Sequence, residues 1–307
     1  MVTMDNGTRK YELVKGWGQL PAGMNWGISA AVTIDSQDNV HVFTRTDHPY
    51  MVFDKSGKLL EHWGRGIFKS AHGLCMGPDD SVYCVDVEAH QVLKFDKNGH
   101  HRLTLGSRDE PSATGWTEES PTVKQAAGPF HRPTDLSLSP AGEMFVADGY
   151  RNARVHKFAP DGTLIKSWGN PGDPAKLKNT KDGPGLFSLV HGIWVHKGRV
   201  YVGDRDNDRV QIFDLDGNHI ETWTDLGSPT KIWIDKDDVV YVTELQDRVS
   251  MLDLAGNVLG RIGERNDRSH DPGKFWGPHG IWGDSNGDLY VSEVLDGARV
   301  QKFARVK

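Results

Sequence analysis

The 307-residue chain contains only two cysteines, so a disulfide framework cannot organise its fold. The two residues, Cys75 and Cys84, are close in the sequence and fall on neighbouring strands of one expected sheet. They could come near enough to form a bridge. Two buried, reduced thiols are the interpretation that we prefer for so few cysteines.

Basic residues and long apolar runs are also scarce. The 36 Lys and Arg residues are outnumbered by 42 Asp and Glu, which gives a net charge of -6, and no basic stripe is present to neutralise phosphates. We therefore expect no nucleic-acid partner. No apolar stretch approaches the length of a membrane span, and Met1 to Arg9 lack the apolar core of a secretion signal. We expect no membrane partner and a cytoplasmic location.

What the chain does contain is an internal repeat, which emerges when the sequence is aligned with itself. Each of six units has an apolar run, a turn rich in Gly, Asp or Asn, and a second apolar run that ends in an acidic residue or Thr. Two columns of equivalent positions define the register. The histidine column is Ala30, His72, Thr134, His191, Thr230 and His279, and the acid column is Thr44, Asp86, Asp148, Asp204, Glu244 and Glu293.

The repeat predicts an all-β fold, a six-bladed β-propeller with four antiparallel strands per blade. Alternating apolar residues indicate strands, and Asp-Gly or Asn-Gly pairs supply the positive φ angles of tight hairpins. Repeated four-stranded units are typical of propeller blades. The sixth unit lacks a fourth strand, and we expect the N-terminal segment Tyr11 to Gly18 to supply it. We expect one domain, residues 1–307.

Three histidines of the histidine column, His72, His191 and His279, occur in alternate repeats. The first strand of every blade lines the centre of a propeller, so the three imidazoles should converge and hold a divalent metal ion with one position open. Zinc fits such ligands, and iron, manganese and cobalt stay open as alternatives. Three ordinary packed histidines are the other interpretation.

The residues after the acid column differ between repeats, which indicates function rather than packing. Arg45 and Arg205 follow the column directly in repeats one and four, and Tyr150 lies two residues after Asp148 in repeat three. An arginine can clamp a carboxylate, and a tyrosine can act as a base. Alternatively, each arginine pairs with the acid column or with a neighbouring blade.

Long connections precede three first strands, at residues 107–132, 171–188 and 264–277. Loops of this length usually carry function. Within them we single out six candidate substrate contacts: Trp116, Lys176, Lys178, Lys181, Phe187 and Trp276.

The chain resembles the NHL-repeat propellers and, among them, the peptidyl-α-hydroxyglycine α-amidating lyases. The motifs that carry the resemblance are Ala71-His72-Gly73-Leu74, Val190-His191-Gly192-Ile193, Trp276-Gly277-Pro278-His279 and Asp148-Gly149-Tyr150-Arg151-Asn152-Ala153-Arg154. The resemblance implies six blades, a zinc ion held by the three histidines, Tyr150 as the catalytic tyrosine, and Arg45 and Arg205 as site arginines.

Three positions depart from the family pattern, and one of them is Arg151, where the family has a cysteine after the catalytic tyrosine. The family holds a structural calcium ion partly through an acid directly after the third histidine, where this chain has Gly280, so a calcium site is not expected. A Met of the family's substrate pocket corresponds to Gly277, which we expect to open space in the pocket.

Together these features predict a metal-dependent lyase. It would cleave the C–N bond of a carbinolamide, such as an α-hydroxyglycine derivative, to an amide and a carbonyl product of the glyoxylate type. The substrate would be a small molecule or short peptide-like compound with a carboxylate. A metal-dependent propeller hydrolase or lactonase is one alternative, and a non-catalytic NHL interaction module is another.

Overall fold

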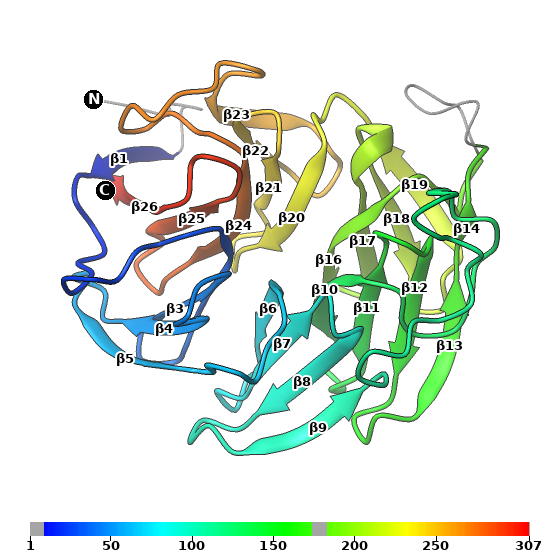
Figure 1. Cartoon of the computed structure of the whole chain (residues 1–307). Helices are drawn as coiled ribbons and strands as arrows, with labels where there is room; N and C mark the ends of the chain where they lie inside the picture. Colours follow the sequence, from blue (N-terminus) through cyan, green and yellow to red (C-terminus); the bar gives the residue numbers. More distant parts are fainter. Residues whose placement is uncertain (1–8, 174–182, 307) are drawn as a thin grey trace. The chain divides into compact units, whose positions relative to one another are not determined.

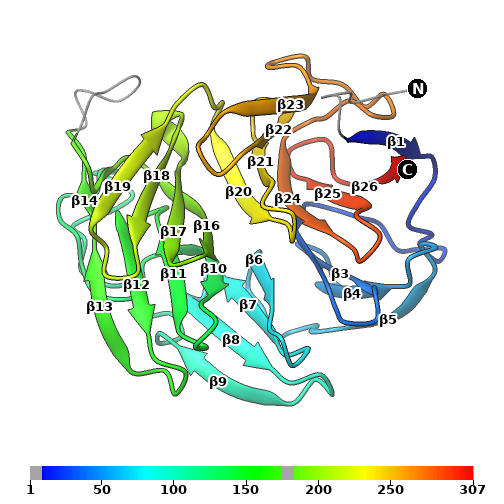
Figure 2. The ribbon, with the colours of Figure 1, turned by 180° about the vertical axis from the view of Figure 1, so that it is seen from behind.

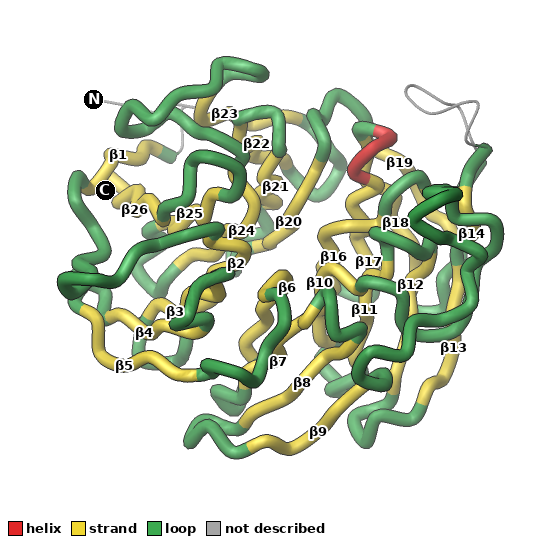
Figure 3. Tube along the Cα trace, viewed as in Figure 1, coloured by secondary structure: helices red, strands yellow, loops and turns green. Residues whose placement is uncertain are grey.

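The computed structural model describes residues 9–173 and 183–306. Nearly all regular structure in this part of the chain is β-strand, as Figure 3 shows, and the short 3-10 helix Arg205–Asn207 is drawn there in red. Six four-stranded sheets follow the six sequence repeats. The fold class is a six-bladed β-propeller with antiparallel blades, as predicted.

The described residues fall into two compact units. One combines the residues up to Ala71 with those from Trp233 onward, and the other runs from His72 to Ile232. The boundaries therefore fall inside β6 and β20. The expectation of a single domain stays a prediction.

The first unit holds the blades of repeats one and six and most of that of repeat five. Repeat one forms β2 (Ser29–Ile34), β3 (Val40–Thr44), β4 (Tyr50–Phe53) and β5 (Leu59–Trp63). Repeat five forms β20 (Pro229–Ile234), β21 (Val240–Glu244), β22 (Arg248–Leu252) and β23 (Val258–Gly263). Repeat six forms β24 (Pro278–Gly283), β25 (Leu289–Glu293) and β26 (Val300–Val306).

The second unit holds the blades of repeats two, three and four. Repeat two forms β6 (Ala71–Met76), β7 (Val82–Asp86), β8 (Gln91–Phe95) and β9 (His101–Leu105). Repeat three forms β10 (Pro133–Leu138), β11 (Met144–Asp148), β12 (Arg154–Phe158) and β13 (Leu164–Trp168). Repeat four forms β16 (Val190–His196), β17 (Arg199–Asp204), β18 (Arg209–Asp214) and β19 (His219–Trp223), and the short strands β14 (Asn170–Pro171) and β15 (Leu186–Phe187) pair before it.

The N-terminal strand β1 (Lys10–Val14) completes the sixth blade. It pairs antiparallel with β26, from Lys10 opposite Val306 to Val14 opposite Lys302. Figure 1 shows β1 alongside β26, and the view from behind in Figure 2 agrees. The predicted closure is confirmed, and it covers an edge of β26 that would otherwise be open to another chain.

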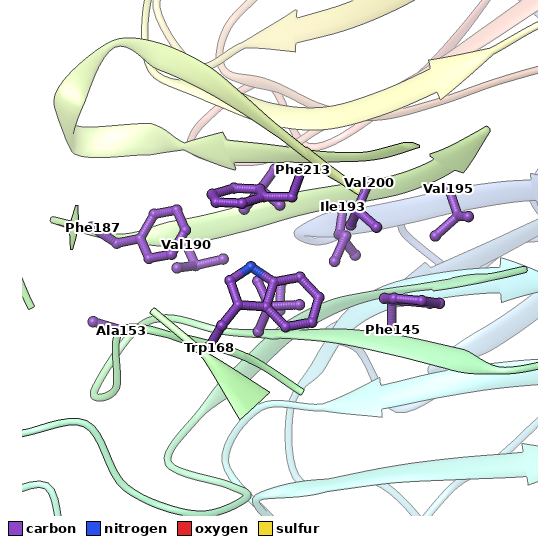
Figure 4. Close-up of a cluster of buried hydrophobic side chains, with 12 residues drawn as sticks. Phe145, Ala153, Trp168, Phe187, Val190, Ile193, Val195, Val200 and Phe213 are labelled. Carbon is purple, nitrogen blue, oxygen red and sulfur yellow. The ribbon is translucent and has the colours of Figure 1, made fainter. Parts of the chain in front are cut away.

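The hydrophobic core lies between neighbouring blades, because alternate residues of each strand face the next sheet. Figure 4 shows one such cluster in the second unit, where Trp168 packs between the blades of repeats three and four. The ring centroid of Trp168 lies 6.2 Å from that of Phe145 and 6.0 Å from that of Phe213. Burying each large apolar side chain contributes about 2 kcal/mol.

Both cysteine thiols are free and buried. Burial raises the pKa of the Cys75 thiol to about 12, so it stays protonated at neutral pH. The interpretation of two reduced thiols is confirmed. Among the described residues, no helix combines the length and apolar character needed to cross a membrane.

Within the first unit, a buried polar cluster joins the N-terminal segment to repeat five. The Arg9 guanidinium, of which 6% is exposed, donates to Asp235 and to the Tyr241 hydroxyl, and the Tyr11 hydroxyl lies 2.8 Å from that of Tyr241. Burial lowers the pKa of Arg9, but the hydrogen bond to Asp235 and attraction to Tyr241 and Asp235 together outweigh burial and raise it. The cluster therefore holds a charged arginine where little water reaches.

We predict that Arg9→Ala lowers the free energy of unfolding by about 3 kcal/mol, because it leaves the Asp235 carboxylate, whose side chain is only 12% exposed, without its cation. Urea denaturation measures the loss. Arg65→Ala is the matched control, since the side chains of Arg65 and Asp47 are 77% and 80% exposed and this pair should contribute about 0.5 kcal/mol at most. Equal stability of the two variants would contradict the prediction.

Candidate functional site

The three histidines of the predicted metal site occupy one structural position. Each is the second residue of an inner strand: His72 in β6, His191 in β16 and His279 in β24. Their exposed fractions are 1%, 1% and 6%. Buried imidazoles need partners for their ring nitrogens, so their surroundings decide what they can do.

Each imidazole is oriented by the main chain of the next repeat. Nδ1 of His72 lies 2.7 Å from the carbonyl oxygen of Thr134. Nδ1 of His191 lies 2.7 Å from the carbonyl oxygen of Thr230, and Nδ1 of His279 lies 2.6 Å from that of Ala30. The three acceptors are the histidine-column residues of the following repeats. A carbonyl can only accept, so Nδ1 carries the proton and Nε2 keeps its lone pair in the neutral ring.

This close approach requires glycine directly after each histidine. A Cβ at Gly73 would lie 2.5 Å from the Thr134 oxygen, and one at Gly192 would lie 2.6 Å from the Thr230 oxygen. Strand pairing is also irregular between Val190 and Ile193, around His191. Such a bulge re-aims a side chain. The His-Gly dipeptides thus reflect the spacing of the blades.

In the second unit, Tyr150 joins His72 and His191. Its hydroxyl lies 3.1 Å from Nε2 of His72 and 3.4 Å from Nε2 of His191, and the two imidazole centroids are 4.8 Å apart. Gly149 makes this placement possible, since a Cβ there would lie 1.7 Å from the Val190 oxygen. The structure therefore brings these three predicted residues together.

Arg205 lies over the Tyr150 ring. Its guanidinium carbon is 5.5 Å from the ring centroid, its Nε donates to Asp206 at 2.8 Å, and its side chain is 17% exposed. Burial lowers the pKa of Arg205, but attraction to Tyr150 and Asp206 outweighs burial and raises it overall. Arg205 thus places a fixed positive charge near the phenol.

In the first unit, Arg45 is exposed and its Nε donates to the carbonyl oxygen of Ala71, the residue before His72. Among the described residues, no ion pair joins Arg45 to the acid column. The hydrogen bond to Ala71 in β6 is instead a contact with the neighbouring blade, the other alternative for this residue. Arg45 lines a pocket of about 350 Å³ with Arg65, Lys69 and other residues of repeat one. An anionic group of a ligand could meet the guanidinium there.

The acid column itself serves the fold. Asp148 accepts from the main chain of His131 and from the side chain of Asn152, and Asp204 accepts from Asn207 and Arg209. The contacts with Asn152, Asn207 and Arg209 tie the ends of β11 and β17 to the residues that follow each strand. In repeats three and four, Asp148 and Asp204 therefore have structural partners.

A buried ion pair that the sequence did not lead us to expect lies next to β16. Lys231 Nζ donates to both carboxylate oxygens of Asp135, at 2.7 and 2.8 Å, and Asp135 also accepts from the main chain of Ile193. Burial raises the pKa of Asp135, against the attraction of Lys231. The sequence did contain a signal for this pair. Glycine follows each of the three histidines of the histidine column, whereas Asp135 and Lys231 follow the two threonines.

Three of the six candidate substrate contacts in the loops lie among the described residues. Lys176, Lys178 and Lys181 lie outside the described residues. Phe187 is 1% exposed within the core cluster, so it packs rather than faces a ligand. The guanidinium carbon of Arg151 lies 3.4 Å from the ring centroid of Trp116. Trp276 is half-buried beside His270.

The space expected at Gly277 is filled. An added Cβ at Gly277 would meet Leu295 Cδ1 at 2.9 Å, so the Leu295 side chain covers this glycine. Sequence spacing did not show this contact because it depends on the conformation of the turn between β25 and β26.

Comparison with known proteins supports the predicted resemblance, although no family model matches the chain. The peptidyl-glycine α-amidating monooxygenase of Mus musculus is 28% identical over 220 residues, which cover 62% of this chain and 21% of that protein. Peptidyl-α-hydroxyglycine α-amidating lyase 1 of Drosophila melanogaster is 32% identical over 170 residues, or 52% of this chain and 28% of that protein. NHL repeat-containing protein 3 of Homo sapiens is 27% identical over 272 residues, or 83% and 72%.

The chain thus spans about a fifth of the length of the first of these relatives. Among solved structures, a virginiamycin B lyase from Staphylococcus aureus has a TM-score of 0.63 at 12% identity, covering 96% of this chain and 100% of that chain. A gluconolactonase from Xanthomonas campestris has a TM-score of 0.65 at 11% identity, covering 98% and 91%. At such identities, these two structures show the fold alone.

We predict that Gly192→Ala lowers the free energy of unfolding by about 2 kcal/mol, because its methyl group would collide with the main chain of the next repeat. Chemical denaturation measures this. Gly128→Ala is the control: nothing lies within 4 Å of its added Cβ, so a change of at most about 0.5 kcal/mol is expected. Equal free energies of unfolding of the two variants would mean that the neighbouring strand moves to accept the methyl group and that glycine is not required at position 192.

Proposed function

We propose that this protein is a metal-dependent lyase that breaks the C–N bond of a carbinolamide of the α-hydroxyglycine type. The products would be an amide and a glyoxylate-type carbonyl compound. The observation that carries the proposal is the Tyr150 hydroxyl, held 3.1 and 3.4 Å from the Nε2 atoms of His72 and His191. Relatives that are named as amidating lyases support the reaction class.

The donor set fits a divalent transition metal. His72, His191 and His279 are buried, and each commits Nδ1 to a main-chain carbonyl, so Nε2 is the nitrogen that would ligate a metal. The three histidines could together hold a metal ion, and we propose zinc. A bound zinc ion would supply Lewis acidity, which makes a coordinated hydroxyl more acidic.

Tyr150 would act as the base. In its phenolate form it takes the proton of the substrate hydroxyl, the C–O bond becomes a carbonyl, and the electron pair of the breaking C–N bond passes to nitrogen. The nitrogen then needs one proton, which Tyr150 can return. The proton balance closes on one residue, without an oxidant or a co-reactant.

The two arginines would have separate roles. Arg205, close to the Tyr150 ring, stabilises the phenolate through its positive charge. Arg45 is exposed and lines a pocket, so it can bind the carboxylate of a small or peptide-like substrate. Neither arginine needs to exchange a proton.

We predict that Tyr150→Phe reduces kcat at least about 100-fold, since it removes the group that moves the proton. Steady-state glyoxylate release from an α-hydroxyglycine derivative measures turnover, and elemental analysis checks that metal is retained. Tyr83→Phe is the control, because it removes the same hydroxyl group from a tyrosine on β7, outside the proposed site. Near-normal turnover in Tyr150→Phe would show that the base is misassigned.

Metal content provides an independent prediction. Wild-type protein should carry about one transition metal per chain, and His72→Ala, His191→Ala and His279→Ala should each lose most of it. His62→Ala, which changes an exposed histidine, should retain it. A folded wild type without affinity for added zinc would favour the non-catalytic NHL module, whereas turnover of lactones without carbinolamide cleavage would favour the hydrolase.

A further inference from the structure

The buried ion pair of Asp135 and Lys231 is not used by the proposed reaction, yet it lies among the residues that orient two of the histidines. Lys231 donates to both carboxylate oxygens of Asp135, and the side chains of Lys231 and Asp135 are 6% and 4% exposed. Burying two charges costs desolvation that their attraction barely offsets, and well-packed apolar residues often serve a fold as well. The pair therefore calls for a role beyond stability.

Asp135 directly follows a residue that orients His72. That residue is Thr134, whose carbonyl oxygen lies 2.7 Å from Nδ1 of His72. Asp135 also accepts from the main-chain N–H of Ile193 in β16, at 3.0 Å. The Thr134 hydroxyl donates to the carbonyl oxygen of His191 at 2.8 Å. These contacts hold the Thr134 segment of β10 against β16, the strand that carries His191.

Lys231 has the corresponding place beside His191. It directly follows Thr230, whose carbonyl oxygen lies 2.7 Å from Nδ1 of His191. A Cβ added to Gly192 would lie 2.6 Å from that oxygen and 2.9 Å from Cα of Lys231, so the main chain at Lys231 is packed tightly against the residue after the histidine. Strand β16 thus contacts both β10 and β20, and the ion pair of Lys231 with Asp135 joins these two strands.

The third histidine is oriented without a charged residue at the corresponding position. In the first unit, the carbonyl oxygen of Ala30 lies 2.6 Å from Nδ1 of His279, and the residue after Ala30 is Ala31. His279 is therefore an internal reference for any effect of the ion pair on the other two histidines.

We propose that the ion pair of Asp135 and Lys231 positions His72 and His191 for metal binding. By joining β10 to β20, it keeps the carbonyl oxygens of the two threonines where they accept from Nδ1, which reserves Nε2 of each ring for the metal. The inference rests on the proposed function and assigns two positioning residues to its metal site. Loss of a group that orients a metal ligand typically weakens metal binding by roughly 10- to 100-fold.

The experiment measures zinc affinity by competition with a chromophoric chelator. Asp135→Asn with Lys231→Met removes both charges together and keeps an acceptor for Ile193. This double variant should bind zinc about tenfold more weakly, while its melting temperature stays within about 5 °C of the wild type. Glu143→Gln with Lys157→Met is the matched control and should leave zinc affinity unchanged. That pair also lies in repeat three, with its charged atoms 3.0 Å apart and its side chains 23% and 10% exposed.

Nuclear magnetic resonance of the metal-free protein, labelled with 15N-histidine, gives a readout that needs no metal. In the wild type, His72, His191 and His279 should each show the tautomer with the proton on Nδ1. In the double variant, His72 and His191 should lose this single tautomer, whereas His279 should keep it. Asp135→Leu with Lys231→Met, which leaves no polar side-chain atom to satisfy, is the second variant if the first does not fold, and the same losses are expected of it.

Four results would overturn the positioning role. They are wild-type zinc affinity in a folded double variant, an equal loss of affinity in the control, a loss of affinity that goes with a large fall in melting temperature, and failure of both double variants to fold.

Failure of the proposed function gives different results. If the wild type binds zinc but cleaves no carbinolamide, the lyase proposal fails and zinc affinity still tests the pair. If the wild type binds no zinc, the proposed metal site fails and the tautomers still decide. Unchanged His72 and His191 signals in the double variant then overturn the inference, and their loss with His279 unchanged supports it.

Discussion

The hydrogen bond from an imidazole Nδ1 to a carbonyl of the next repeat is the constraint on which the candidate site depends. It recurs at His72, His191 and His279, with distances of 2.6 to 2.7 Å. Because a carbonyl has no proton to give, the bond fixes both the ring orientation and the tautomer. The same main-chain approach that packs one blade against the next therefore prepares each histidine as a ligand.

This coupling explains why small residues flank the reactive ones. Gly73 and Gly192 allow the next strand to approach the histidine column, and Gly149 allows the turn that carries Tyr150 to lie against β16. Charges near this region are compensated, as in the buried pair of Asp135 and Lys231. The proposed site is consequently pre-organised by packing and needs few polar contacts of its own.

Much of the fold could be predicted because the repeat reports strand register directly. The period placed His72, His191 and Tyr150 at positions that the structure brings together, and the missing last strand pointed to the N-terminal segment. The extent of that segment was less accurate: β1 ends at Val14, and Gly16 and Gly18 then adopt positive φ angles that break the strand.

Other features depend on contacts that spacing along the chain does not encode. The pairing of Asp135 with Lys231 joins repeats three and five, so the sequence of either repeat alone does not predict it. The position of Leu295 over Gly277 follows from one left-handed residue in a turn. The Arg45 side chain could have paired with an acid, and it donates instead to the main chain of Ala71. In each case a side-chain or loop conformation, rather than the register, decides the contact.

The pairing of β1 with β26 also sets an order on how the chain can fold during synthesis. The ribosome synthesises β1 before the strands of the other blades and β26 after them, so the sixth blade cannot be completed until the other five have been made. Until then β1 has an unsatisfied edge, and crowded nascent chains could pair through it. Strand β1 thus protects the folded protein from association, whereas during synthesis its own open edge exposes the chain to association.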